Sequence, residues 1–187
     1  MKKKLAAALG GGAVLMLVLS GCGDDGEEKT SGWAKKVCDS WQPQLKKIED
    51  ANAQIKRVAG ESSKPEEVQQ TDSAAFQTLA DAYKAIGAGL SSAGEPPVKD
   101  SRPSMEAAVK DFTATSQGYA DLKAKIDALD PKDQAKFAAG LQELADGLDK
   151  VAASEKTAKD KLKSANLSDP LAKQPGCQIT TSSPAAG

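Results

Sequence analysis

FAAGLQELADGLDKVAASEKTAKDKLKSA, residues 137–165, has the most regular hydrophobic pattern in the chain. Its apolar residues recur at alternating steps of three and four, which places them on one face of an α-helix. Glu155 interrupts this series, and small residues such as Ala145 and Gly147 flank the face on both sides. Because small flanks allow neighbouring helices to approach closely, we expect this long helix to be the central packing partner of a helical bundle. Asp130 is expected to cap it, with Pro131 in the first helical position.

Three further amphipathic helices are predicted, over about 32–59, 63–93 and 101–129, each with apolar residues at helical spacing. Pro43 lies within the first of them and predicts a kink rather than an end, because the apolar series continues past it. Ser63 and Glu66 have the spacing of a capping box. The loops are short and no segment alternates with a period of two. The chain is therefore predicted to be all-α, an antiparallel up-down four-helix bundle over 32–178, with a disordered tail at 179–187.

The N-terminal segment has the layout of a secretory signal. Three lysines at 2–4 precede an apolar run over 5–20, which is shorter than the roughly 20 residues that a membrane span needs. We therefore expect residues 1–21 to be a signal peptide.

The run Leu19-Ser20-Gly21-Cys22 resembles the lipobox of bacterial lipoproteins. The resemblance implies that the chain is cut before Cys22 and that the Cys22 sulfur carries a lipid. The mature protein would then be anchored to the membrane through Cys22, on the outer face of the cytoplasmic membrane. Residues 22–31 are acidic and lack apolar side chains beyond the cysteine, so they are expected to form a flexible linker.

Cys38 and Cys177 are the two cysteines that remain once Cys22 is lipidated. An exported protein meets an oxidising compartment, which favours a disulfide over a reactive thiol or a metal pair. In the up-down topology, the start of the first helix and the end of the fourth lie at the same pole. The disulfide is therefore expected to join the N- and C-terminal ends of the bundle.

The composition excludes several functions. The chain has no histidine, which removes Ser-His-Asp and Cys-His catalytic sites and histidine-containing zinc or di-iron sites. Removing the signal removes three lysines and no acid, so the formal net charge falls from −1 to −4. With no basic patch, nucleic acid is not an expected partner. No cofactor or metal is expected, and the chain is expected to be a monomer.

Three residues are candidates for a functional contact. Trp33 and Trp41 lie on the hydrophobic stripe of the first helix, which favours a core role over contact with sugar or a membrane interface. Glu155 lies at a seam position, where it either fixes helix register, sits in a wet part of the bundle, or acts as a catalytic acid. Asp72 is the only comparable polar intrusion, and no acidic partner follows Glu155 on its own seam.

Several runs resemble small secreted lipoproteins of high-GC Gram-positive bacteria. They are Cys38-Asp-Ser-Trp-Gln-Pro-Gln, Thr71-Asp-Ser-Ala-Ala-Phe-Gln, Ala82-Tyr-Lys-Ala-Ile-Gly, Lys132-Asp-Gln-Ala-Lys-Phe-Ala and Ala172-Lys-Gln-Pro-Gly-Cys. The resemblance supports the anchored location and the helical fold. It implies no activity and no catalytic residues, because this family carries no established activity.

The sequence predicts a non-enzymatic binding or scaffold protein of the cell envelope. The polar helix faces would meet cell-wall polymer or an envelope protein, or they are simply solvated. The alternative is a carrier of a small apolar ligand, in which Ser116, Gly140 and Gly147 line a cavity; the same residues could instead let the helices close up. A carboxylate-based enzyme using Glu155 is the least favoured hypothesis.

Overall fold

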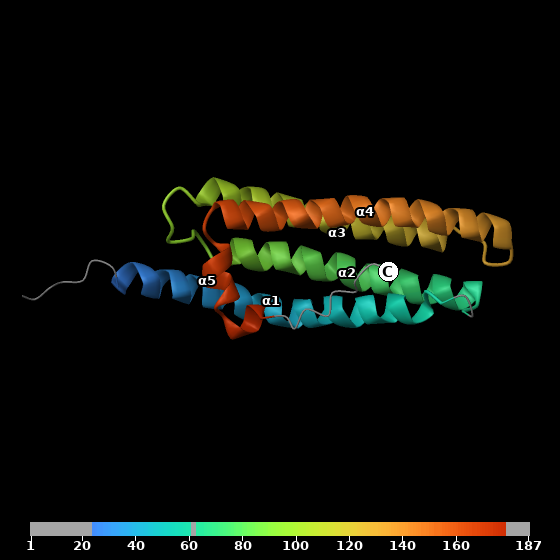
Figure 1. Ribbon diagram of the computed structural model, residues 1–187, viewed down its shortest axis with the longest axis horizontal. Coiled ribbons are helices and arrows are strands. Elements are labelled where there is room, and N and C mark those ends of the chain that lie inside the picture. Colours follow the sequence, from blue (N-terminus) through green and yellow to red (C-terminus); the bar gives the residue numbers. More distant parts are fainter. Residues whose placement is uncertain (1–23, 61–62, 179–187) are drawn as a thin grey trace, which may run out of the picture.

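The structure, a computed structural model, describes residues 24–60 and 63–178. Four long helices pack together, and these residues contain no strand (Figure 1). The helices are α1 (Asp24–Val58), α2 (Pro65–Ser92), α3 (Arg102–Asp127) and α4 (Gln134–Ser164). The prediction of an all-helical fold with four long helices is confirmed. The expected signal peptide and C-terminal tail lie outside the described residues.

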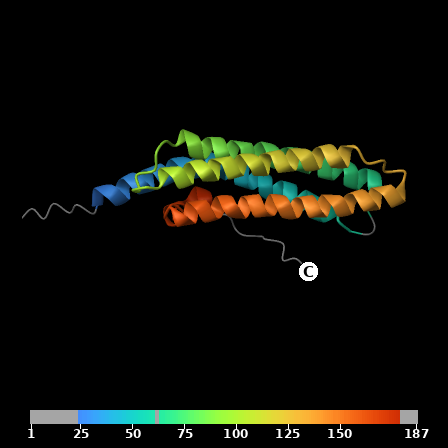
Figure 2. The same ribbon diagram turned by 90° about the horizontal axis from the view of Figure 1, so that it is seen from above.

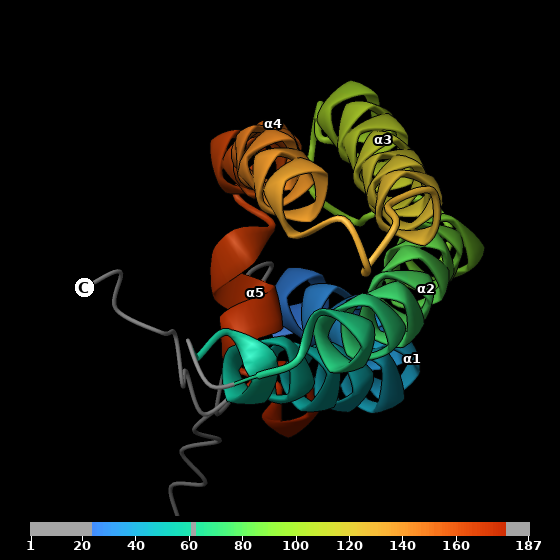
Figure 3. The same ribbon diagram turned by 90° about the vertical axis from the view of Figure 1, so that its right-hand side faces the viewer.

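The two middle helices form the centre of the bundle. α2 packs against both α1 and α3, and α3 packs against both α2 and α4, as the end-on view in Figure 3 shows. The expectation that the fourth helix is central was therefore wrong. Its buried residues follow one narrow strip, namely Phe137, Leu144, Val151, Ala158 and Leu162. A buried strip this narrow packs against one main neighbouring helix, and that helix is α3.

Glycines bring α3 and α4 close together. A Cβ built on Gly147 would lie 2.5 Å from Leu122 Cδ2, and one on Gly118 would lie 2.6 Å from Val151 Cγ2. Each glycine therefore accepts a branched side chain from the facing helix. The small flanks noticed in the sequence promote close packing, but on one side of α4 only.

α1 begins at Asp24, well before the expected start at Gly32, and it continues through Pro43 without ending. The flexible linker expected over 22–31 is therefore helical from Asp24 onward, and the first turns of α1 project beyond the other helices (Figures 1 and 2). Acidic residues favour the positive end of a helix dipole, which suits the acidic composition here. Gln174 Nε2 also donates to Ser31 Oγ at 3.2 Å, which ties this segment to the C-terminal part of the chain.

Two helix caps differ from the expected ones. Lys64 rather than Ser63 precedes α2, without a side-chain cap, so the capping box does not form. Asp133 rather than Asp130 caps α4, accepting from Lys136 N at 3.1 Å. Asp130 accepts from Lys132 N at 2.9 Å, which makes a tight turn before the helix begins.

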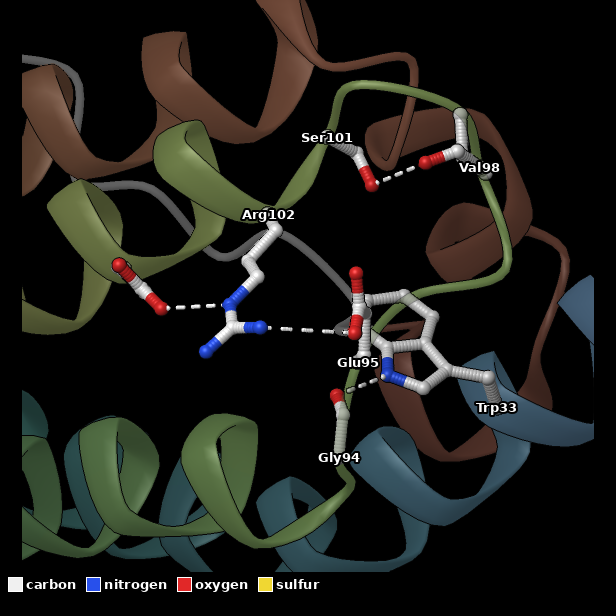
Figure 4. A network of polar contacts seen from close by, with 7 residues as sticks. Trp33, Gly94, Glu95, Val98, Ser101 and Arg102 are labelled. Atoms are coloured by element: carbon white, nitrogen blue, oxygen red, sulfur yellow. Dashed lines mark hydrogen bonds and ion pairs between the residues drawn. The ribbon is translucent and has the colours of Figure 1, made fainter.

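Trp33 closes one end of the bundle. Its indole Nε1 donates to Gly94 O at 3.0 Å in the α2–α3 connection, where Gly94 has a φ of +83° (Figure 4). In the same connection, Ser101 Oγ donates to Val98 O at 2.6 Å. Trp33 is buried, as the hydrophobic stripe predicted. At the other end of the bundle, Gln69 Nε2 donates to Ile126 O in the last turn of α3 and to Leu129 O just after it.

A short helix, α5 (Ser168–Ala172), follows α4 and contacts both α4 and α1. It falls in a segment expected to be a polar return, but Leu167 and Leu171 are buried there. A 3₁₀ turn, η1 (Pro175–Cys177), carries Cys177 to Cys38, and the predicted disulfide is confirmed, with a Cα–Cα distance of 5.0 Å.

Candidate functional site

An apolar cavity of about 270 Å³ lies between α1 and α4, on the side of the bundle that α5 spans. All five helices contribute to its wall: Trp41, Leu45 and Ile48 from α1; Tyr83 and Ile86 from α2; Phe112 from α3; Glu155, Lys159 and Leu162 from α4; Ser168, Leu171 and Ala172 from α5; and Cys177 after them. We call it the α1–α4 cavity. Leu45 and Ile48 are only half-buried, so the cavity opens to solvent along α1.

The cavity follows from the packing order of the helices. α4 packs along α3, and α5 contacts both α4 and α1 and spans the side between them (Figure 3). The Cys38–Cys177 disulfide anchors the segment that follows α5 to α1. A Cβ on Gly176 would lie 2.8 Å from Cys38 O, so only glycine allows this close approach. The cavity is thus closed at this end by a covalently attached segment.

Aromatic rings form one part of the wall. Trp41 packs edge-on against Phe112, with ring centroids 5.7 Å apart, and Phe112 stacks on Tyr83 at 6.4 Å. Tyr83 in turn stacks on Tyr119 at 5.6 Å. Pairs with such geometry stabilise a core by about 0.5–1.5 kcal/mol each beyond their burial. The rings therefore form a packed aromatic surface.

The indole of Trp41 is fixed in place by its only polar group. Trp41 Nε1 donates to Ile86 O in α2 at 2.9 Å. Gly89, one turn further along α2, lets α1 approach, because a Cβ there would lie 2.3 Å from Ser40 Oγ. Trp41 is 8 % exposed, which confirms the core prediction for its burial. Of the two tryptophans, Trp41 lines the cavity, and Trp33 does not.

Glu155 is the one carboxylate among the cavity-lining residues. Its side chain is 24 % exposed and pairs with Lys159 at 2.5 Å, whereas the Lys159 side chain is 67 % exposed. The sequence presented Glu155 as isolated on its seam; the structure provides a basic partner one turn away and two tyrosines across the bundle. Burial, and then the charge of Glu155, raise the pKa of Tyr83 and bring the pKa of Tyr119 to about 12.

Asp72 is buried but lies elsewhere. It precedes Tyr83 by about three helical turns on α2, roughly 16 Å along the axis, and it does not line the cavity. Burial raises the pKa of Asp72 from 3.8 to about 6, and its Oδ1 has no hydrogen-bond partner. Glu155 and Asp72 therefore do not form the carboxylate pair that the enzyme hypothesis needs.

The small residues proposed as cavity walls have other roles. Ser116 Oγ donates to Ala80 O at 2.7 Å, Gly147 packs against Leu122 of α3, and Gly140 packs against Leu129 just after α3. These small residues let the helices pack closely, which was the alternative to lining a cavity. Of the residues that do line the cavity, Trp41 and Glu155 were candidates for a functional contact, and the others were not. The sequence signal that points to them is the seam position of Glu155.

Two larger hollows are polar or shallow by comparison. One of about 650 Å³ lies between α3 and α4 and is lined by exposed charged residues such as Asp121, Lys125 and Glu143. Another, of about 560 Å³, lies between the start of α1, the α2–α3 connection and α5. Water competes well for sites lined by exposed charges, so neither offers the apolar contact area of the α1–α4 cavity.

Cys22, the proposed lipid attachment site, lies outside the described residues. Within residues 24–60 and 63–178, no helix is both long and apolar enough to cross a membrane. The same residues contain no cluster of three or more metal-ligating side chains. Comparison of the chain with protein-family models, curated protein sequences and solved structures finds no match.

Proposed function

We propose that this chain is a lipid-anchored, extracytoplasmic protein that binds a small apolar ligand, without catalysis, in the α1–α4 cavity. The observation that carries the proposal is the cavity itself, with its aromatic wall and its opening along α1. Ligand sites are typically preformed, mostly apolar hollows with a few polar groups. At about 25 cal/mol per Å² of apolar area, a ligand burying about 200 Å² would gain about 5 kcal/mol before the costs of association.

The location of the protein rests on its N-terminal sequence. The signal-like leader and the lipobox resemblance at Cys22 support export and anchoring on the outer face of the cytoplasmic membrane. The resemblance to small lipoproteins of high-GC Gram-positive bacteria supports the same location. A lipid on Cys22 would be the membrane contact, and stable anchoring needs more than one acyl chain.

An antiparallel up-down order of the four helices is part of this proposal. The bond from Trp33 to the α2–α3 connection supports placing the start of α1 at the same pole as that connection. The bond from Gln69 to Ile126 supports placing the start of α2 beside the end of α3. The disulfide supports placing the end of the fold near the start of α1.

The other hypotheses have less support. A scaffold role toward cell-wall polymer or an envelope protein rests on the polar helix faces alone. A carboxylate-based enzyme would use Glu155 without a second acid in the cavity, since Asp72 lies about three turns of α2 before Tyr83 and does not line the cavity. The cavity favours the ligand carrier over both.

A fluorescence titration tests the binding proposal. The mature chain, residues 22–187 with Cys22→Ser, would be titrated with phenylnaphthylamine, a neutral dye that brightens in apolar sites. We expect saturable binding that is lost in Ala172→Trp, because the added indole would fill the cavity at α5. Ala153→Trp, on an exposed part of α4 away from the cavity, should bind as the parent does. Equal binding by both tryptophan variants would contradict the proposal.

A further inference from the structure

The α1–α4 cavity combines aromatic faces with a single inward carboxylate. Trp41, Tyr83 and Phe112 contribute rings to one wall, and Glu155 contributes the negative charge. Because the Trp41 N–H is already bonded to Ile86 O, the indole offers the cavity only its carbon surface. Aromatic faces attract cations, most strongly where water is excluded.

Of the two charged side chains that line the cavity, Glu155 is more buried than Lys159. The Glu155 side chain is 24 % exposed, while its partner Lys159 is 67 % exposed and can extend into solvent along its flexible stem. Ion pairs between i and i+4 residues at a helix surface are weak, so Lys159 can be displaced by another cation. Burial raises the pKa values of Tyr83 and Tyr119, and the negative charge of Glu155 raises them further.

We infer that the ligand of this cavity is a small organic cation with an apolar body, an alkyl- or arylammonium compound whose charged group lies between Glu155 and the aromatic wall. This inference rests on the proposed function, because it requires the α1–α4 cavity to bind a ligand. The apolar residues Leu45, Ile48 and Leu162 would contact the body of the ligand. An anionic ligand would instead bring its charge toward Glu155, at a cost in the partly desolvated site.

Three ligands of similar shape and different charge distinguish these possibilities. (Phenylbutyl)trimethylammonium, phenylpentanol and phenylpentanoate would each compete with phenylnaphthylamine for the mature chain. We expect the cation to bind about tenfold more tightly than the carboxylate, with the alcohol between them. Tighter binding of the carboxylate, or equal binding of all three, would overturn the inference and leave the proposed function intact.

Two variants locate the preference at Glu155. Glu155→Gln keeps the shape of the side chain and should reduce the advantage of the cation to about threefold or less, with the alcohol little affected. Glu143→Gln, on an exposed part of the same helix, should keep the full preference. If Glu155→Gln kept it as well, the inference would be wrong. If phenylnaphthylamine itself did not bind, the proposed function and the inference that rests on it would both fail.

Discussion

Asp72 is a buried carboxyl group, and the free energy that its burial costs can be measured from the pH dependence of stability. Burial raises its pKa from 3.8 to about 6, so the carboxyl group binds its proton more tightly in the folded chain than in the unfolded one. The stability that protonation contributes is complete below about pH 4 and is lost as the pH rises through 6. Asp72 should therefore weaken the fold at neutral pH.

Replacing Asp72 by Asn should raise the free energy of unfolding at pH 7–8. Each pKa unit corresponds to about 1.4 kcal/mol, and partial access of water lowers the net effect, so we expect a gain of about 1–2 kcal/mol. The gain should disappear near pH 4. Urea melts at several pH values measure it, with Asp81→Asn as the control on an exposed position of α2. A constant difference between variant and parent across this range would refute the titration of Asp72.

Glu155 should contribute little to stability, because its side chain is only partly buried and its ion-pair partner Lys159 is exposed. Its ion pair with the exposed Lys159 contributes at most about 0.5 kcal/mol, and removing a carboxylate from apolar surroundings offsets that loss. We therefore expect Glu155→Leu to be neutral, or stabilising by up to about 1 kcal/mol, in thermal melts at neutral pH. A loss of about 3 kcal/mol or more would mean that Glu155 anchors a buried pair, and the enzyme hypothesis would need to be reconsidered.

The burial of single residues was largely predictable from the sequence, but which of them lie together around the cavity was not. The helical spacing of Trp33 and Trp41 indicated that both are buried, and they are. Spacing alone cannot tell which buried residue borders an empty volume, because that depends on which helices fail to meet. The pairing of Glu155 with Tyr83 across the bundle likewise depends on the relative position of α4 and α2.

At the scale of elements, long periodic segments were predicted well and their ends poorly. The four long helices were expected, but α1 starts earlier and α4 starts later than predicted. α5 was not predicted, because its five residues contain Pro170 and cannot show a helical period. Its position is determined by tertiary contacts, through the burial of Leu167 and Leu171 and through the disulfide.

The Cys38–Cys177 disulfide should be a major source of stability. It closes a loop with a sequence separation of 139, for which the chain-entropy model gives about 4–5 kcal/mol. We expect the double variant Cys38→Ala/Cys177→Ala to lose about that much in urea melts, and to lose phenylnaphthylamine binding when α5 is no longer held against α1. Adding a reductant should destabilise the parent and leave the double variant unchanged.

The state of the two thiols in the exported protein checks the same bond directly. The mature chain should gain two protons in mass on reduction, and it should resist alkylation before reduction. Two thiols that react without reduction would contradict the disulfide.

At the scale of the whole molecule, the start of α1 determines how the proposed anchor holds the bundle. α1 begins two residues after Cys22, so a lipid on Cys22 would hold the bundle near the membrane rather than at the end of a long linker. Trp41 lies about 26 Å further along the helix, at 1.5 Å per residue. The cavity would therefore face the space just outside the membrane.

Lipid attachment at Cys22 is tested by metabolic labelling. Cells that express the full chain with a clickable fatty acid should yield a labelled protein in the membrane fraction, because the lipobox resemblance predicts acylation there. Cys22→Ala should be unlabelled. The variant Cys38→Ala/Cys177→Ala should remain labelled, which separates acylation from the other two cysteines. Labelling of Cys22→Ala to the same extent as the parent would rule out this attachment site.

The central claim, that the α1–α4 cavity is a ligand site, is tested most directly by the chain's two indole N–H signals in NMR spectra of the nitrogen-labelled mature chain. Trp41 lines the cavity, whereas Trp33 lies about 12 Å away along α1, bonded to the α2–α3 connection. A Trp33→Phe variant assigns the two signals. On titration with phenylnaphthylamine, the account predicts that the Trp41 signal shifts and saturates while the Trp33 signal stays in place. Unchanged signals at saturating dye, or a shift of Trp33 alone, would contradict it.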